Sequence, residues 1–262
     1  MPFLRIASTI TGHLSRIRLP QWLARQVISV FVRNYAINTG EIKEPLASFR
    51  SLNQFFIREL NPVFRPIDPN GIVSPVDGRI ITWGTLRKDS IVQAKEINYS
   101  VDELVTPTLS EPFYDGHFMT FYLAPSDCHR IFAPVSGQII TSRQIPGTLF
   151  PVREPYVSNT PGLFARNERL ITIMETEAGK VAVVKVGAFN VSSITVTYDD
   201  HIRRNHLRHY SPAKYVDKGQ WLGTFNFGST VILIFQKKRM AFHQNIGHVK
   251  IRYGQIIGQI IP

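Results

Sequence analysis

Residues 225–235 read Phe-Asn-Phe-Gly-Ser-Thr-Val-Ile-Leu-Ile-Phe. The apolar run after Thr230 indicates a buried β-strand, and the small residues before it are typical of a turn that leads into a strand. A Gly-Ser-Thr step at the beginning of a strand is also where some proteins cut their own backbone, which converts the serine into a pyruvoyl group. The segment therefore predicts a strand close to the C-terminus, preceded either by an ordinary turn or by a cleavage site between Gly228 and Ser229.

A pattern of short strands and turns extends from Gly71 to the end of the chain. The 262 residues include 17 prolines and 17 glycines, which favour turns and short strands over long helices. We expect strands, mostly antiparallel, at residues 80–83, 117–123, 138–141, 171–175, 181–186, 193–196, 230–235 and 255–260.

Two segments repeat one pattern, small-Pro-Val-x-Gly-x-Ile, at residues 74–80 and 133–139. The pattern predicts a repeated turn that leads into a strand, as in small sandwiched barrels. The loop residue Asp77 is the exception, because the second copy has Ser136 there.

Residues 1–60 have a helical pattern. Pro20 suits the first turn of a helix over 21–35, and a second helix is expected over 48–60 with Ser48 as its N-cap. Asn61-Pro62 ends that helix. The sequence thus predicts an α+β protein with N-terminal amphipathic helices (1–60) and a β-rich catalytic domain (61–262) with barrel-sandwich-like turns.

The net charge of +11 implies an anionic partner, and the charge is distributed unevenly. No acidic residue precedes Glu41, whereas arginines alternate there with large apolar residues and Trp22. This pattern is typical of helices that lie in a lipid interface, although a helical pair packed on its own core would also produce it. No segment has the roughly 18 uncharged apolar residues that would span a bilayer, and the beginning of the chain does not resemble a secretory signal. A transit peptide is less favoured, because the pattern continues into the domain.

A second basic stretch covers residues 198–218 and contains three histidines, His201, His206 and His209. We expect a mobile basic loop there, either simply solvated or in contact with anionic headgroups. The histidine spacing matches no standard zinc site, and the single cysteine, Cys128, excludes an intrachain disulfide. No metal is predicted.

Backbone cleavage at Ser229 requires a base near the serine hydroxyl and a group that orients the base. Asp77 in its tight turn, together with Asp127 and His129 after the strand at 117–123, supplies residues of the right types. An Asp-x-His pair alone is usually structural.

Several ordered motifs resemble the bacterial phosphatidylserine decarboxylases. They are Ser-Pro-Val-Asp-Gly (74–78), Gln-Ala-Lys (93–95) with Asn-Tyr-Ser (98–100), Ala-Pro-Ser-Asp-Cys-His-Arg (124–130), Leu-Phe-Ala-Arg-Asn-Glu-Arg (163–169), Val-Gly-Ala-Phe-Asn-Val-Ser-Ser-Ile (186–194) and Phe-Gly-Ser-Thr (227–230). The resemblance extends from about Phe49 onward.

The resemblance implies self-cleavage between Gly228 and Ser229 into chains 1–228 and 229–262, with Ser229 becoming the pyruvoyl cofactor. The pyruvoyl carbonyl would react with the amino group of phosphatidylserine and accept electrons from the departing carboxylate, giving phosphatidylethanolamine. It also implies that His129 acts in decarboxylation, supported by Asp127, and that Asp77 orients the maturation base.

One residue departs from the family pattern Asp-aromatic-His-Arg-x-His. Phe132 stands where the second histidine, the maturation base, belongs. His129 or a histidine of 201–209 could substitute for it. Three functions stay open: a working decarboxylase, a maturation-deficient lipid-binding homologue, and a pyruvoyl or serine-ester enzyme acting on another amino compound.

The expected partners follow from the charge pattern and the resemblance. They are an anionic phospholipid membrane, phosphatidylserine, and the chain's own cleaved small fragment; a homodimer stays open. Nucleic acid is not expected, since no binding module is present and the charge lies among bulky apolar residues. We expect a peripheral protein at the cytoplasmic face of the cell membrane.

Overall fold

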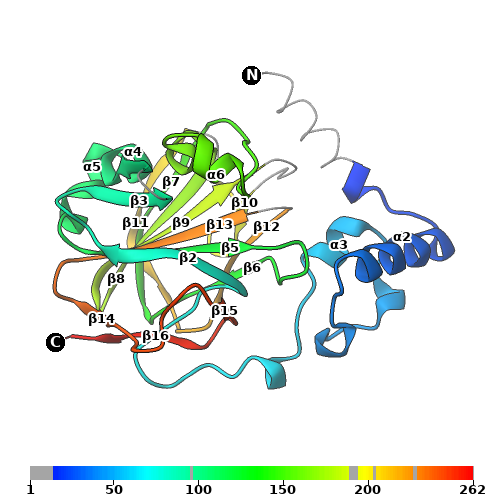
Figure 1. Cartoon of the computed structure of the whole chain (residues 1–262). Helices are drawn as coiled ribbons and strands as arrows, with labels where there is room; N and C mark the ends of the chain where they lie inside the picture. The colour runs from blue at the N-terminus through cyan, green and yellow to red at the C-terminus, as the bar shows by residue number, and fades with distance from the viewer. Residues whose placement is uncertain (1–13, 95–96, 189–193, 203–204, 227–228, 262) are drawn as a thin grey trace.

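The computed structural model describes residues 14–94, 97–188, 194–202, 205–226 and 229–261. A short helical N-terminal segment stands beside a body built from antiparallel strands (Figure 1). The predicted α+β class and antiparallel pairing are confirmed. The largest sheet is open, with β11 and β15 at its edges.

After a helical turn at residues 14–16, the described part of the N-terminal segment contains five elements. They are α2 (Gln21–Asn34), η1 (Thr39–Glu41), η2 (Leu46–Ser48), α3 (Leu52–Phe56) and η3 (Pro62–Phe64). The helix predicted over 21–35 is confirmed by α2. The helix predicted over 48–60 is wrong in extent, because Ser51 rather than Ser48 caps α3 by accepting from the Gln54 N–H. After α3 the chain extends, and an isolated bridge pairs Leu60 with Ile42.

Eight strands form the central sheet in the order β11-β7-β8-β9-β13-β5-β2-β15. Their bounds are β2 (Gly78–Thr85), β5 (His117–Leu123), β7 (Gly137–Ile145), β8 (Arg169–Thr176), β9 (Gly179–Gly187), β11 (Leu207–Val216), β13 (Ser229–Phe235) and β15 (Lys250–Ile251). Each predicted strand coincides with an observed one, six of them in this sheet and two in smaller sheets.

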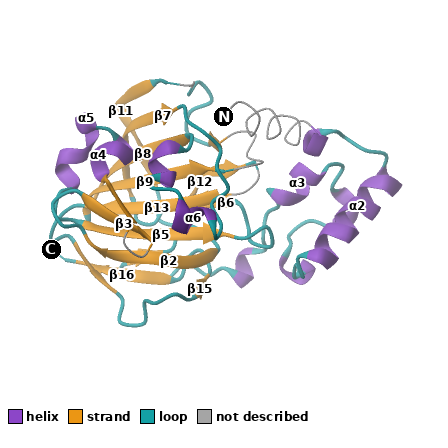
Figure 2. Cartoon of the chain, turned by 45° about the horizontal axis from the view of Figure 1, so that its top comes forward, coloured by secondary structure: helices purple, strands orange, loops and turns teal. Residues whose placement is uncertain are grey.

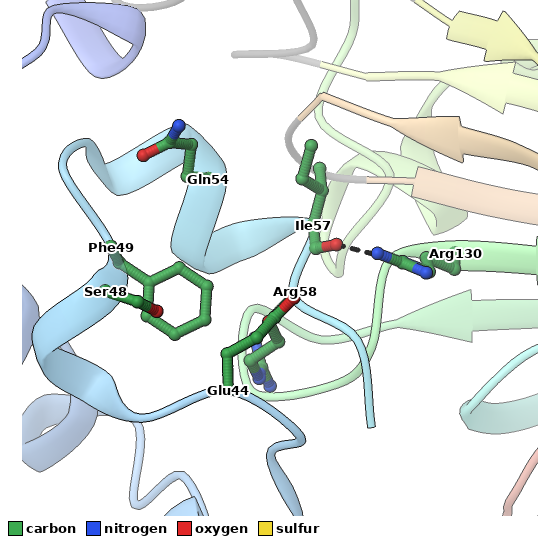
Figure 3. Close-up of a pocket in the computed structure, with 7 residues that line it drawn as sticks. All are labelled: Glu44, Ser48, Phe49, Gln54, Ile57, Arg58 and Arg130. Carbon is green, nitrogen blue, oxygen red and sulfur yellow. Dashed lines mark hydrogen bonds between the residues drawn. The ribbon is translucent and has the colours of Figure 1, made fainter. Parts of the chain in front are cut away.

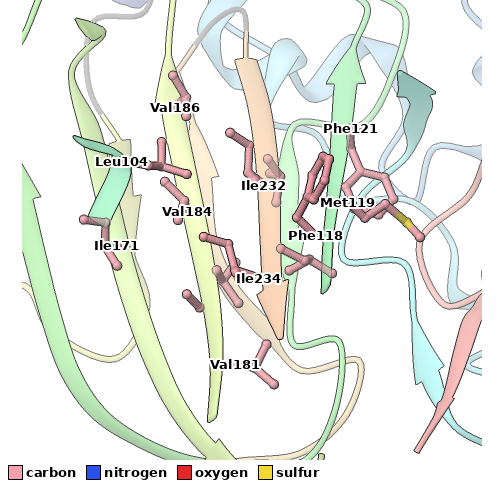
Figure 4. Packing of buried hydrophobic residues seen from close by; sticks show 14 of the residues in the cluster. Leu104, Phe118, Met119, Phe121, Ile171, Val181, Val184, Val186, Ile232 and Ile234 are labelled. Atoms are coloured by element: carbon pink, nitrogen blue, oxygen red, sulfur yellow. The ribbon is translucent and has the colours of Figure 1, made fainter. Parts of the chain in front are cut away.

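The predicted strand after Thr230 is the buried centre of this sheet. All residues from Val231 to Phe235 are completely buried, because β13 lies between β9 and β5 and both faces are covered. Figure 4 shows Ile232 and Ile234 of β13 beside Val184 of β9 and Phe118 of β5. An uninterrupted apolar run, rather than alternation, is what a strand covered on both faces requires.

Smaller elements cover the two faces. They are β1 (Ile72–Val73), β16 (Ile256–Ile260) and β14 (Met240–Phe242) in one sheet, β10 (Ile194–Val196), β12 (Trp221–Phe225) and β6 (Arg130–Phe132) in another, the hairpin β3 (Ser90–Ala94) and β4 (Ile97–Ser100), and the helices α4 (Val101–Val105), α5 (Pro107–Ser110), η4 (Glu111–Phe113), α6 (Tyr156–Asn159) and α7 (Leu163–Arg166). Figure 2 shows α4, α5 and α6 gathered on one side of the strands.

Contacts of β8 show which element covers which face. The Arg169 Nε donates to the Leu104 carbonyl of α4 at 2.6 Å. Thr172, three residues along the strand and therefore on the other face, contacts the hydroxyl of Tyr198, which follows β10. The helices and the β10 sheet thus enclose the central sheet from opposite sides.

The repeated pattern forms two turns that lie side by side, and each leads into a strand as predicted. The Val73 N–H donates to the Pro134 carbonyl, and the Phe132 N–H donates to the Pro75 carbonyl. Glycine is required at Gly78, because a Cβ there would approach the Tyr122 carbonyl oxygen to 2.5 Å. The paired turns bring Asp77 and Phe132 into one region of the molecule.

The mobile loop predicted over 198–218 is wrong, because about half of the segment, residues 207–216, is the edge strand β11. β11 pairs with β7 through a register shift between His209 and Lys214 that contains Pro212. Its side chains are mostly polar because one edge faces solvent, so the apolar alternation that identifies a strand is missing. Among the described residues, no helix has the length and apolar character needed to cross a membrane.

Candidate active site

The predicted cleavage site lies where β13 begins. The Ser229 backbone pairs with Leu123, the last residue of β5, and with Gly187, the last residue of β9. Seven consecutive residue pairs hold β13 to each neighbour. Gly228 and the Ser229 side chain lie outside the described residues. The backbone of β13 is therefore held in the sheet from its first residue, Ser229.

His129 lies beside this junction. Its carbonyl accepts a hydrogen bond from the Phe225 N–H at 3.0 Å, just before the Gly-Ser step. Its Nε2 is 3.1 Å from the carbonyl of Ala124, the residue after Leu123. Because a carbonyl only accepts, the ring proton is on Nε2. The His129 ring therefore lies against the turn after β5, while the His129 backbone holds the segment that precedes β13.

The His129 ring is completely buried, and it stacks on Phe56 of α3 with a centroid separation of 3.8 Å. Burial, with the nearby Arg58 charge, lowers the pKa of His129 to about 3. The imidazole is consequently neutral at physiological pH, the form that can accept a proton.

Asp127 shapes the loop that carries His129. Its Oδ2 accepts a hydrogen bond from the Ala124 N–H at 2.8 Å, and its own N–H donates to the Ala124 carbonyl. Lys250 lies 3.7 Å from its other oxygen. Burial raises the pKa of Asp127 above its ordinary value. Its contacts are those of a turn-forming residue, which suits the supporting role predicted for it.

Asp77 is buried, and an arginine holds its carboxylate. The Arg65 Nε donates to Oδ1 at 3.0 Å and Nη2 donates to Oδ2 at 2.6 Å, while the Tyr253 N–H donates to Oδ1 at 2.9 Å. Arg65 also pairs with Glu41 at 2.8 Å. Although burial opposes the charge, the hydrogen bonds and charges of Asp77 and Glu41 raise the pKa of Arg65. Within the described part of the chain, no hydrogen bond joins Asp77 to His129.

Phe132 lies next to this ion pair. Its ring stacks on Tyr253 with a centroid separation of 3.9 Å and an interplanar angle of 17°. The same Tyr253 donates its backbone N–H to Asp77. A ring that cannot carry a proton thus lies in the region of Asp77.

His209 of the basic stretch lies far from the junction within the central sheet. His209 lies on β11 and its Nδ1 is 3.0 Å from Thr141 Oγ1 of β7. β7, β8 and β9 separate β11 from β13, a distance of about 19 Å at the usual strand spacing. His129 is therefore better placed than His209 to substitute for residue 132.

Lys185 is a charged residue that sequence reasoning missed. It lies on β9 opposite Val231 and is completely buried. Its Nζ donates to Thr172 Oγ1 at 2.5 Å and to the Val183 carbonyl at 3.3 Å. Burial lowers the pKa of Lys185 to about 7. The single lysine in the apolar run 181–186 was the available signal.

Arg65 and Arg58 were also missed, because nothing local in the sequence distinguishes a buried arginine from a solvated one. In the described ranges, no group of three or more His, Cys, Asp or Glu side chains is arranged to hold a metal ion.

Comparison with known proteins identifies relatives along most of the chain. The family model described as phosphatidylserine decarboxylase matches residues 52–259. A phosphatidylserine decarboxylase proenzyme of Myxococcus xanthus is 39% identical over 261 residues, covering 97% of this chain and 93% of the relative. Proteins of the same name from Brevibacillus brevis and Saccharophagus degradans are 40% and 38% identical, covering 83% and 97% of this chain and 81% and 92% of the relatives.

Proposed function

Because the chain belongs to the phosphatidylserine decarboxylase family, we propose that it converts phosphatidylserine into phosphatidylethanolamine and carbon dioxide. It does so with a pyruvoyl group made from Ser229, after self-cleavage at Gly228–Ser229 into chains 1–228 and 229–262. The observation that carries this proposal is the position of the Ser229 backbone, paired on both sides and adjacent to the loop of the buried His129.

The surroundings of residue 229 suit a cofactor made from the chain itself. The strand pairs that hold the residue involve β13, β5 and β9, and none depends on the bond to residue 228. A pyruvoyl carbonyl supplies an electron sink for the loss of a carboxylate from a bound amine. We assign proton transfer to His129 through Nδ1, the ring nitrogen that is unprotonated when Nε2 donates to the Ala124 carbonyl, and to Asp127 the turn that fixes the imidazole.

Maturation requires the Ser229 hydroxyl to attack the Gly228 carbonyl, which gives an ester, and a base to remove the Ser229 α-proton so that residue 228 leaves as a carboxylate. The dehydroalanine that remains then hydrolyses to the pyruvoyl group and ammonia. Asp77 is tied to Arg65, and Phe132 cannot accept a proton. We therefore assign the base to His129, which is neutral at physiological pH but, with a pKa of about 3, only a weak base. A missing dedicated base costs roughly 10²–10⁴ in rate, so self-cleavage should be slow.

Exposed apolar residues of the N-terminal segment support peripheral attachment to an anionic membrane, at its cytoplasmic face. Trp22 and Val30 of α2 are 65% and 51% exposed, and Leu14 and Ile17 before the helix are similarly open. Exposed tryptophan and aliphatic side chains beside arginines are typical of interfacial helices.

A second function, that of a lipid-binding homologue that never matures, is favoured by the Phe132 stack beside Asp77. The intact mass of the purified protein separates the two functions. The decarboxylase should accumulate a fragment of residues 229–262 with a blocked terminus, and Ser229→Ala should prevent both the cut and carbon dioxide release. A wild-type chain that stays whole after long incubation would leave only the lipid-binding function.

A further inference from the structure

A cavity of about 320 Å³ is lined by residues 44–58 of the N-terminal segment and by Arg130, the first residue of β6. Its walls include Glu44, Ser48 and Phe49 on one side, and Ile57, Arg58 and Arg130 on the other (Figure 3). This volume is within the roughly 300–1,000 Å³ typical of small-ligand sites. Two arginines on one small cavity suggest an anionic ligand.

Arg58 is the stronger indication, because its charge has no carboxylate partner within salt-bridge distance among the described residues. It is 3% exposed, and its Nη atoms donate only to carbonyls, with the Ser126 carbonyl at 2.6 Å and the Phe55 carbonyl at 3.4 Å. The Nε is buried without a hydrogen-bond partner in the described structure. A buried guanidinium that is neither neutralised nor fully hydrogen-bonded is costly, and a bound anion would remove that cost.

Arg130 presents a second guanidinium in a fixed orientation. Its Nε donates to the Ile57 carbonyl at 3.1 Å (Figure 3), and its plane lies over the Trp221 ring at 4.1 Å. Glu59 lies 3.3 Å from Nη1. Arginine forks held in this way suit phosphate oxygens, which accept two parallel hydrogen bonds.

The cavity adjoins the proposed reaction site through two elements. Arg130 follows His129 directly, so one loop serves both sites. Asn53 of α3 donates to Oδ1 of Asn226, close to the cleavage site, while the next residue, Gln54, lines the cavity. The apolar walls Phe49 and Ile57 suit the carbon skeleton that joins a headgroup to its acyl chains.

We propose that this cavity binds the phosphodiester of the phospholipid headgroup, with Arg58 and Arg130 on its oxygens. Glu44, the carboxylate on the wall, opposes the anion and keeps its affinity moderate. The inference rests on the proposed function for the choice of a lipid phosphodiester over other phosphates. It concerns the uncut chain, so it can be tested without any cleavage.

The test uses the full chain carrying Ser229→Ala, which stays whole, and glycerophosphoserine as a soluble headgroup in titration calorimetry. Arg58→Gln and Arg130→Gln should each weaken binding by roughly 10- to 100-fold, the loss expected for a hydrogen bond to a charged group. Glu44→Gln should tighten binding about 2- to 5-fold, because it removes a like charge. Arg50→Gln, an exposed arginine of the same segment, should leave binding unchanged.

Equal affinity of all four variants, or a loss with Glu44→Gln, would overturn the proposal. If Arg58→Gln unfolds, Arg130→Gln and Glu44→Gln still decide it. Inorganic phosphate serves as the competing probe: binding as tight as that of glycerophosphoserine would assign the cavity to free phosphate and overturn the lipid assignment. Failure of wild-type cleavage would contradict the proposed function but leave these affinities unaffected.

Discussion

The phenyl ring of Phe132 lies in the region of Asp77, the residue that the proposed maturation would pair with a base. Phe132 stacks on Tyr253, and Tyr253 donates its N–H to the Asp77 carboxylate. Arg65 donates hydrogen bonds to both oxygens of the Asp77 carboxylate. Arg65 and Tyr253 therefore hold the Asp77 carboxylate in place, although residue 132 offers it no base.

Phe132→His should restore that base and accelerate self-cleavage by about 10²–10⁴, the usual contribution of a general base. The measurement is the rate at which the 229–262 fragment appears on denaturing gels. Phe132→Leu is the matched control, since it removes the ring without adding a base, and should bring no acceleration. Similar rates for both variants would mean that residue 132 does not limit maturation.

Lys185 predicts a pH dependence of stability. Its folded pKa of about 7 lies below the ordinary lysine value, so the unfolded chain binds more protons between the two values and stability rises with pH there. In the Ser229→Ala background, the free energy of unfolding of the parent relative to Lys185→Met should increase by roughly 2–3 kcal/mol from pH 6 to pH 9. Urea titrations at both pH values measure it.

Lys180→Met provides the control on the same strand, because the Lys180 side chain reaches solvent. Its stability difference from the parent should change little between the two pH values. If the stability difference between the parent and Lys185→Met also stayed constant from pH 6 to pH 9, the lowered pKa of Lys185 would be contradicted.

At the scale of elements, the strands that the sequence predicted are those whose own residues determine them. β13, β9 and β5 are apolar because they are covered on both faces, and that pattern is local. β11 was missed because an edge strand can be polar, and its pairing with β7 is a long-range contact. The prediction for α3 was too long at its beginning because Ser48 and Ser51 are both plausible N-caps. The structure uses Ser51.

The candidate site also contains some residues that local motifs predict and some contacts that only the fold produces. Asp77, Asp127, His129 and Ser229 were found from motifs, since each stands at a turn or strand end with a recognisable pattern. The Arg65–Asp77 pair spans 12 residues, the Tyr253–Asp77 contact spans 176, and the cavity brings Arg130 to residues 44–58. No local pattern specifies such contacts, so they follow only from the fold.

Helix α2 carries the prediction about the membrane. Trp22→Ser with Val30→Ser removes exposed apolar area from α2 and should reduce binding to anionic vesicles several-fold, because interfacial affinity scales with that area. Vesicle cosedimentation measures it. Tyr215→Ser is the control, since Tyr215 is 62% exposed on β11. A loss seen only with Tyr215→Ser would place the membrane contact on the edge strand instead.

At the scale of the whole molecule, strands of residues 229–262 pair with strands of residues 1–228. β13 pairs with β5 and β9, β15 pairs with β2, and β16 pairs with β1. The cut chain should therefore run as one species in native size-exclusion chromatography and as two on a denaturing gel. Separation of the fragments under native conditions would contradict this arrangement.

The paired beginning of β13 also bears on how long a cut molecule survives. Aminopeptidases and the cell's unfolding proteases engage a loose chain end, and cleavage before residue 229 would create an end that is already locked into a sheet on both flanks. The new terminus should offer these enzymes no starting point. Turnover of the matured protein would then be set by its other ends and surface loops.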